Sequence, residues 1–312
     1  MASQAYAPAL RRWLERAPIL RSLVWACEAG ALWLAWAALR ALGPDRAARL
    51  GTAAIGAVGP RLRKSRQVRA NLARAFPELV EAEREALASR VWGSTGAMLA
   101  DFANLDRICG REARERIEVV VKSDLQVFSG PGRPAVFVAA HLANFQIGTV
   151  AAAHRGAPMT ALYSPISNPL IDRLIRRRRR AISCGLVPRD GGMRALAGEL
   201  RNGRSVGLVV DTRIDGGVPV PFFGVDAETS TAPARLALRF GCELVPIRVE
   251  RIADARFRVT FGEPVTSEDP ALGSKQRALL MTRKLNAQFE TWIRERPDQW
   301  LCLKRRWPKD AA

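Results

Sequence analysis

The sequence Val136-Phe-Val-Ala-Ala-His-Leu-Ala-Asn-Phe-Gln-Ile-Gly148 sets the expected architecture of the chain. It begins within an unbroken apolar run, Ala135 to Ala140, which predicts a strand covered on both faces. From Leu142 the apolar residues follow helical spacing, so His141 is expected between a strand and a helix. Open α/β sheets place their ligands at the carboxyl ends of strands, and the positive end of a helix dipole favours a neutral imidazole. A general base needs that protonation state.

A histidine after a strand can also cap a helix or fill a polar gap without taking part in chemistry. Two observations favour a catalytic role for His141. The chain has only one other histidine, His154. Asn144 and Gln146 also follow at offsets that return to the same side of the predicted helix as His141.

The composition allows one large α/β domain or two smaller ones, because 48% of the 312 residues are hydrophobic. We favour membrane-associating helices over residues 1–60 and one catalytic domain over residues 61–312, whose helical lead-in covers 61–118. Forty-nine Lys plus Arg against thirty Asp plus Glu give a formal charge of +19. Such a charge predicts an anionic partner.

Nucleic acid, an anionic membrane surface and an acidic carrier protein would all satisfy this charge. Nucleic acid is disfavoured because the chain has only two tyrosines and shows no aromatic-rich RNA-binding motif or zinc-finger spacing. The five cysteines are scattered without a CxxC pair. This pattern predicts a reducing compartment, no disulfide framework and no metal site.

An apolar segment from about Leu23 to Leu42 favours a membrane surface as one partner of the chain. It is nearly long enough to span a bilayer, but it contains Glu28, which is costly in hydrocarbon. Spanning once and lying in the inner leaflet therefore both remain open. Arg11, Arg12 and Arg16 precede the segment, and a basic run from Arg61 to Arg69 follows it. Both would attract an anionic surface.

The run His141-Leu-Ala-Asn144-Phe-Gln146 resembles the His-x4-acid motif of glycerolipid and lipid A acyltransferases, written His-Phe-Gly-Asn-Trp-Glu in the lipid A branch. Here an amide, Gln146, occupies the position of the acid. Tyr163-Ser-Pro-Ile-Ser-Asn-Pro-Leu-Ile-Asp172 is similar to a second family element, and the arginine run after it places Arg177 and Arg179 on the family's arginines.

Three later segments extend the resemblance. Asp211 and Pro221-Phe-Phe-Gly224 match a family element of aspartate, glycine-bearing loop and Val-Pro-Phe-Phe-Gly. Thr229-Ser-Thr-Ala-Pro-Ala-Arg-Leu-Ala resembles the family's capped helix. The closing segment, Pro297 to Trp307, matches with Lys304 in place of a histidine.

The resemblance implies an α/β fold with a mainly parallel central sheet flanked by helices. It implies transfer of a fatty acyl chain from acyl carrier protein, or acyl-CoA, to a hydroxyl of an anionic lipid A precursor at the cytoplasmic face of the bacterial inner membrane. Neither a cofactor nor a metal is implied. Other acceptors, such as another glycolipid, a lysophospholipid or an aminolipid, stay open, as does a catalytically weakened lipid-binding protein.

The same resemblance assigns roles to individual residues. His141 is the expected base, and Gln146 a neutral group that orients it. Asp211 could instead supply the missing carboxylate. The residues expected to contact substrate are Asn144, Tyr163, Arg177, Arg179 and Asp211.

Overall fold

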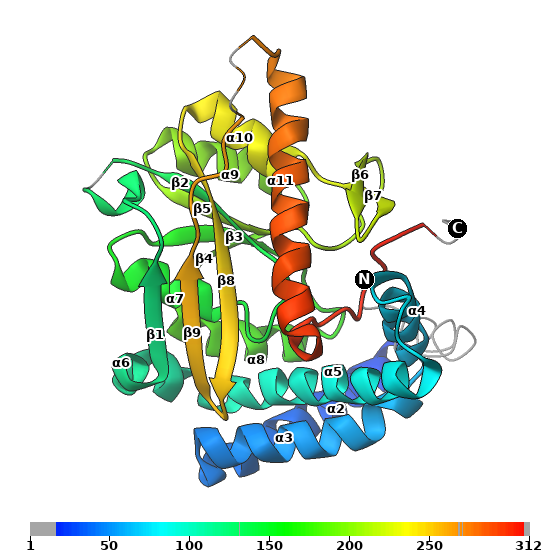
Figure 1. Ribbon diagram of the computed structural model, residues 1–312. Coiled ribbons are helices and arrows are strands. Elements are labelled where there is room, and N and C mark those ends of the chain that lie inside the picture. The colour runs from blue at the N-terminus through cyan, green and yellow to red at the C-terminus, as the bar shows by residue number, and fades with distance from the viewer. Residues whose placement is uncertain (1–16, 131, 268, 270, 309–312) are drawn as a thin grey trace.

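A seven-stranded sheet forms the centre of the molecule (Figure 1). The computed structural model describes residues 17–130, 132–267, 269 and 271–308, so Arg11, Arg12 and Arg16 lie outside the described residues. The strands stand in the order β1-β9-β8-β2-β5-β3-β4. Their bounds are Ile117–Val121 (β1), Ala135–Ala139 (β2), Met159–Tyr163 (β3), Gly185–Pro188 (β4), Ser205–Val209 (β5), Glu243–Ala253 (β8) and Arg256–Phe261 (β9).

Neighbouring strands in this sheet are parallel except for the β8–β9 hairpin, which confirms the predicted mainly parallel sheet. In the centre, β2 pairs with β8 on one side and β5 on the other. Strands β2, β5, β3 and β4 therefore all end at one edge of the sheet, here called the carboxyl edge. His141 follows β2 at this edge.

Alternate residues of β2 feed two hydrophobic cores, as the period of a strand requires. Val136 and Val138 belong to the core shared with helices α9 (Gly192–Arg201), α10 (Ala232–Phe240) and α11 (Ser274–Glu295). Phe137 belongs to the other core, with α7 (Ile147–His154) and the inner side of α8 (Pro169–Arg179). Burial on both faces explains why the sequence of β2 is apolar throughout.

Helices from the first part of the chain pack across one end of the sheet (Figure 1). The principal ones are α2 (Pro18–Leu42), α3 (Pro44–Val58), α4 (Ser65–Ala75) and α5 (Glu81–Asp101). Helices α3 and α5 cross closely, since a Cβ atom built on Gly96 would lie 2.0 Å from the Gly51 carbonyl oxygen. The predicted boundary near residue 60 thus falls within one packed helical layer, and independent folding of residues 61–312 stays a prediction.

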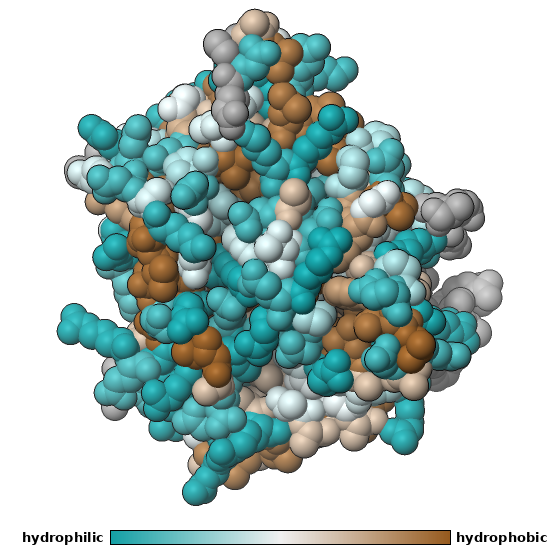
Figure 2. Space-filling view, viewed as in Figure 1, coloured by the Kyte–Doolittle hydropathy of each residue, from teal (hydrophilic) through white to brown (hydrophobic). Residues whose placement is uncertain are grey.

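Among the described residues, α2 is the one helix long and apolar enough to cross a membrane. The molecular face in Figure 2 is mainly hydrophilic, with hydrophobic side chains gathered in a few places, including the lower edge where α3 lies. Large exposed hydrophobic residues of the first two helices are Ile19, Leu23, Trp33, Leu34, Leu42, Leu50 and Val58.

The helix predicted from Leu142 begins only at Ile147, so the expectation that His141 adjoins a helix N-terminus is wrong. Residues 140–146 instead form a loop, here called the histidine loop. Ala143 adopts a left-handed φ of 47°, which interrupts helical geometry. The backbone of the loop pairs with the C-terminal segment: Ala143 N–H donates to the Gln299 carbonyl at 2.9 Å, and Leu301 N–H donates to the His141 carbonyl at 2.8 Å.

A two-stranded sheet, β6 (Val218–Phe222) and β7 (Val225–Thr229), supports that C-terminal segment. Arg306 is fully buried between them, where it donates to the Thr229 hydroxyl at 2.7 Å and lies 4.6 Å from the centre of the Phe222 ring. These contacts fix the course of residues 299–307. The segment can therefore present Trp300 and Lys304 to the carboxyl edge.

Candidate active site

His141 and Asp211 meet at the carboxyl edge because each follows one of two adjacent parallel strands, β2 and β5. The Nδ1 atom of His141 lies 2.6 Å from Oδ1 of Asp211. The second carboxylate oxygen, Oδ2, accepts a hydrogen bond from Trp300 Nε1 at 2.9 Å. The Asp211 side chain is 1% exposed and that of His141 is 20% exposed, so the pair presents only the imidazole to solvent.

These contacts settle the charge of the carboxylate. Burial raises the pKa of Asp211, but the neighbouring His141 ring and the hydrogen bonds from His141 and Trp300 lower it by more, so that the pKa is about 2. An ionised carboxylate can only accept, which requires the proton of a neutral imidazole to sit on Nδ1. Nε2 is then left with a lone pair, as a general base needs.

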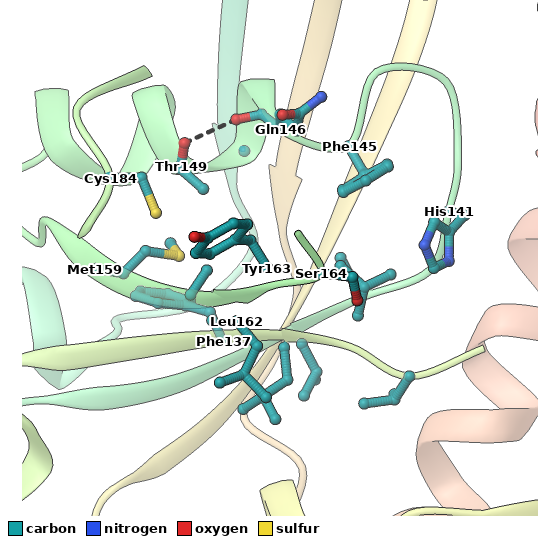
Figure 3. Close-up of a pocket in the computed structure, with 18 of the residues that line it drawn as sticks. Phe137, His141, Phe145, Gln146, Thr149, Met159, Leu162, Tyr163, Ser164 and Cys184 are labelled. Carbon is teal, nitrogen blue, oxygen red and sulfur yellow. Dashed lines mark hydrogen bonds between the residues drawn. The ribbon is translucent and has the colours of Figure 1, made fainter. Parts of the chain in front are cut away.

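Gln146 was expected to orient His141, but its hydrogen-bond partners are other residues. Its Oε1 accepts a hydrogen bond from Arg179 Nε at 2.8 Å, and its Nε2 lies 3.4 Å from Oδ1 of Asn144. In Figure 3, Phe145 lies between Gln146 and His141, and its ring meets the imidazole edge-on with centroids 4.9 Å apart. The residue that holds His141 Nδ1 is Asp211, and Gln146 holds the half-buried Arg179.

The structure brings some of the predicted substrate residues to the site and leaves others away from it. Tyr163 and Arg179 line the same cavity as His141 and Gln146. Burial lowers the pKa of the Arg179 guanidinium, whose Nε is bound by Gln146. Arg177 is exposed on α8 and does not line this cavity.

Asn144 is a fully buried residue of the histidine loop and does not line the cavity either. Its amide donates to Asp101 Oδ2 at 2.9 Å, and Arg251 pairs with the same oxygen at 2.5 Å. Asp101 and Arg251 belong to α5 and β8, so this network ties the loop to the helical layer and the sheet. Asn144 therefore positions the loop.

A cavity of about 460 Å³ extends from His141 into the protein. Figure 3 shows Met159 and Cys184 at the end opposite His141, with Tyr163 between them. Much of its wall is apolar and includes Phe137, Met159, Leu162, Leu208 and Ile247. Its charged lining residues are Arg179, Arg189, Arg213 and Lys304. The site thus combines an imidazole paired with a carboxylate, a largely apolar chamber and a cationic lining.

Three contributors to the site were missing from the prediction. Trp300 reaches Asp211 from 89 residues away in the sequence, and no local pattern marks that contact. Arg189 follows β4, and a search for polar residues at strand ends could have found it. Lys304 was noticed only as a departure from the family motif. Across the described residues, no group of three or more His, Cys, Asp or Glu side chains is placed to hold a metal.

Comparison with known proteins agrees with this chemistry. The profile of the family described as bacterial lipid A biosynthesis acyltransferase matches residues 20–309. A lipid A biosynthesis acyltransferase of Haemophilus influenzae is 21% identical over 249 residues, which cover 79% of this chain and 76% of the relative. A phosphatidylinositol mannoside acyltransferase of Mycobacterium tuberculosis is 26% identical over 298 residues, 92% of this chain and 89% of the relative.

One solved structure, the 1-acyl-sn-glycerophosphate (LPA) acyltransferase of Thermotoga maritima, aligns with 80% of this chain and 96% of its own, with 17% identity and a TM-score of 0.37. The family assignment rests on the profile, which covers nearly the whole described chain. This protein therefore belongs to the bacterial lipid A biosynthesis acyltransferase family and is an acyltransferase.

Proposed function

We propose that this protein transfers a fatty acyl chain from a thioester carrier to a hydroxyl of a lipid A precursor. The observation that carries the proposal is the His141–Asp211 pair at one end of a mainly apolar cavity. The cavity volume of about 460 Å³ lies within the roughly 300–1,000 Å³ of ordinary ligand pockets. An acyl chain fits such a chamber chemically, with its thioester next to the imidazole.

In this mechanism, Nε2 of His141 removes the proton from the acceptor hydroxyl while the oxygen attacks the thioester carbonyl. The resulting imidazolium is stabilised by the ionised Asp211 carboxylate, which also holds the ring in orientation. The tetrahedral intermediate then collapses, the carbon–sulfur bond breaks, and the thiolate takes the proton from imidazolium. The products are an ester and a free thiol.

The donor we infer is acyl carrier protein, with acyl-CoA as the alternative. The formal charge of +19 favours an acidic carrier, because opposite charge speeds encounter. The basic run between Arg61 and Arg69 and the apolar outer side of α2 support work at an anionic leaflet. We assign the protein on this basis to the cytoplasmic face of a bacterial inner membrane.

A second glycolipid acceptor is favoured by one specific observation, the similarity to phosphatidylinositol mannoside acyltransferases over 92% of the chain. A lysophospholipid or an aminolipid has no comparable support. The intact pair of His141 with a buried carboxylate supports an active enzyme over a weakened lipid-binding protein, even though Gln146 occupies the position of the motif acid.

The test uses purified full-length protein in mixed micelles, acyl carrier protein charged with one fatty acid, and a lipid A precursor as acceptor. Mass spectrometry should show the acceptor gaining one acyl group with wild type and with Arg201→Ala, an exposed change at the end of α9, but not with His141→Ala. Acylation of phosphatidylinositol mannoside alone would move the assignment to the second acceptor. Equal activity in His141→Ala would overturn the mechanism.

A further inference from the structure

Helix α2 has one side against the protein and one side without charge. Its three charged residues, Arg21, Glu28 and Arg40, all lie on the partly buried side. None of its exposed residues between Pro18 and Leu42 is charged. Among these, Ile19 is 79% exposed and Leu34 is 63% exposed.

This arrangement is the reverse of an ordinary surface helix, which turns its charged side to water and its apolar side to the core. Here the apolar outer side runs the full length of 25 residues. At 1.5 Å per residue, the helix is about 38 Å long. Such a strip needs an apolar environment along its whole length, and a single small protein contact would cover only part of it.

The inner side of α2 is bound to the catalytic domain from its first third to its end. Asn168 donates to the Trp25 carbonyl at 3.0 Å and to the Glu28 carboxylate at 2.9 Å. Near the other end, Arg40 binds Asp106 at 2.6 Å and the Ala103 carbonyl at 3.2 Å. The domain thus flanks the helix from residue 25 to residue 40, a rise of about 23 Å.

These contacts bear on the orientation of α2 in a membrane. If α2 crossed the bilayer while keeping them, Asn168 and the start of α8 would be drawn to the depth of the hydrocarbon core, because Trp25 and Glu28 lie near the middle of α2. Charged and polar groups at that depth are strongly unfavourable unless they are enclosed by protein. A helix that lies parallel to the surface avoids this, because its inner side can stay in protein and only its outer side enters lipid.

We propose that α2 lies in the plane of one lipid leaflet, with its uncharged side in the acyl region and α8 beside it at the level of anionic headgroups. This inference rests on the proposed function at a membrane. Charge complementarity supports the choice of partner, because α8 packs against α2 and exposes Arg173, Arg176 and Arg177, and the turn that follows α8 exposes Arg180. In this arrangement, the exposed arginines that do not line the cavity bind anionic headgroups.

The orientation also places the cavity next to the leaflet. Arg178 lies 5.9 Å from the centre of the Trp36 ring on α2, and the neighbouring Arg179 lines the cavity. Trp36 in turn stacks on Phe102 with ring centroids 6.0 Å apart. Helix α8 therefore contacts both the membrane-facing helix and the chamber.

The test measures depth along α2 with nitroxide labels at four positions of its outer side, Leu23, Gly30, Leu34 and Ala41, each changed to Cys in full-length protein whose partly or fully exposed native cysteines are Ser. These positions lie within about 40° of one another on a helix of 3.6 residues per turn. Labels are compared for accessibility to oxygen and to a water-soluble nickel chelate on vesicles of phosphatidylethanolamine and phosphatidylglycerol. A label at Lys275, at the far end of α11 in Figure 1, is the aqueous control.

The proposal expects all four α2 labels at a similar shallow depth, with the Lys275 label in water. A profile that is deepest at Gly30 and Leu34 and shallow at Leu23 and Ala41 would show a spanning helix and overturn it. Four labels in water would remove the membrane contact altogether. Acyl transfer measured on the same vesicles tests the function separately. An active enzyme with a spanning profile would contradict the proposed orientation of α2 but not the proposed function.

Discussion

The state of the His141 imidazole follows from two residues distant in sequence. Asp211 arrives from the neighbouring strand, and Trp300 arrives from the C-terminal segment to donate to the same carboxylate. Together they keep the carboxylate ionised and the proton on Nδ1. The loss of the motif acid at Gln146 therefore leaves the proposed base with a full negative charge beside it.

Changing Asp211 to Asn tests that charge. The amide can still hold the ring but cannot stabilise imidazolium, so we expect kcat to fall by about 10²–10⁴-fold, the usual worth of acid–base assistance. Steady-state kinetics with acyl carrier protein as donor checks this, and circular dichroism verifies folding. A kcat within a few-fold of wild type would contradict a role for the carboxylate.

The acid stability of the same variant supplies an independent measurement. Folding lowers the pKa of Asp211 from 3.8 to about 2. The unfolded chain therefore binds this proton first, so the stabilisation is complete above about pH 4 and is lost as the pH falls towards 2. Between these limits we expect the free energy of unfolding of wild type to fall by about 2 kcal/mol more than that of Asp211→Asn. Urea titrations at fixed pH values give the free energy of unfolding of each protein as a function of pH. If folding did not lower the pKa of Asp211, the curves for wild type and Asp211→Asn would be parallel.

The substitution Gln146→Glu separates two interpretations of Gln146, which occupies the position of the motif acid. Either it orients His141, or it binds Arg179. Because Gln146 Oε1 faces Arg179, a carboxylate there should form a partly buried ion pair with Arg179 and no second contact to His141. We expect no gain in acyl transfer on the scale of 10²–10⁴-fold. Gln146→Leu, which leaves Arg179 Nε without its acceptor, should cost about 1–3 kcal/mol of stability. A large gain in activity for Gln146→Glu would restore Gln146 as the group that orients the base.

At the scale of elements, long periodic segments were predictable and tertiary pairings were not. The strand at Ala135 to Ala140 was predicted and is β2, and the apolar segment from about Leu23 to Leu42 lies within helix α2, because both patterns depend only on the local sequence. The short strands β1 and β4 were not predicted. The helix predicted from Leu142 failed because the chain 158 residues later pairs with the loop, which no local pattern records.

The crossing of α3 and α5 allows a matched pair of glycine substitutions. A Cβ on Gly96 would meet the Gly51 carbonyl, whereas a Cβ on Gly198, in α9, meets nothing within 4 Å. Gly96→Ala should therefore destabilise the protein by about 1–3 kcal/mol through overpacking. Gly198→Ala should stabilise it by about 0.5–1 kcal/mol, since alanine is the better helix former. Chemical unfolding of both variants checks the prediction, and equal effects would exclude a tight crossing.

For the whole molecule, the resemblance was sufficient for the fold class, because the motifs that carry it are spread over most of the chain. The site was only partly predictable. His141 could be placed at the carboxyl end of a strand and Asp211 could be named as a substitute carboxylate, but their pairing depends on the strand order, in which β5 adjoins β2. The partner of Gln146 depends on where α8 packs, which the arginine run alone does not reveal.

The charge of the whole molecule leads to the last prediction. With +19 on the enzyme, association with an acidic carrier should be accelerated by the summed field, and that field is screened over about 10 Å at 0.1 M salt. We expect kcat/KM for acyl carrier protein to fall by roughly tenfold or more between 20 and 300 mM salt, within the 10–10³-fold range of electrostatic steering. kcat at saturating carrier should change little, because chemistry in the cavity is screened less than the encounter. Stopped-flow binding of labelled carrier protein over the same salt range locates the effect in the association rate. A kcat/KM independent of salt would show that the basic surface serves the membrane and not the donor.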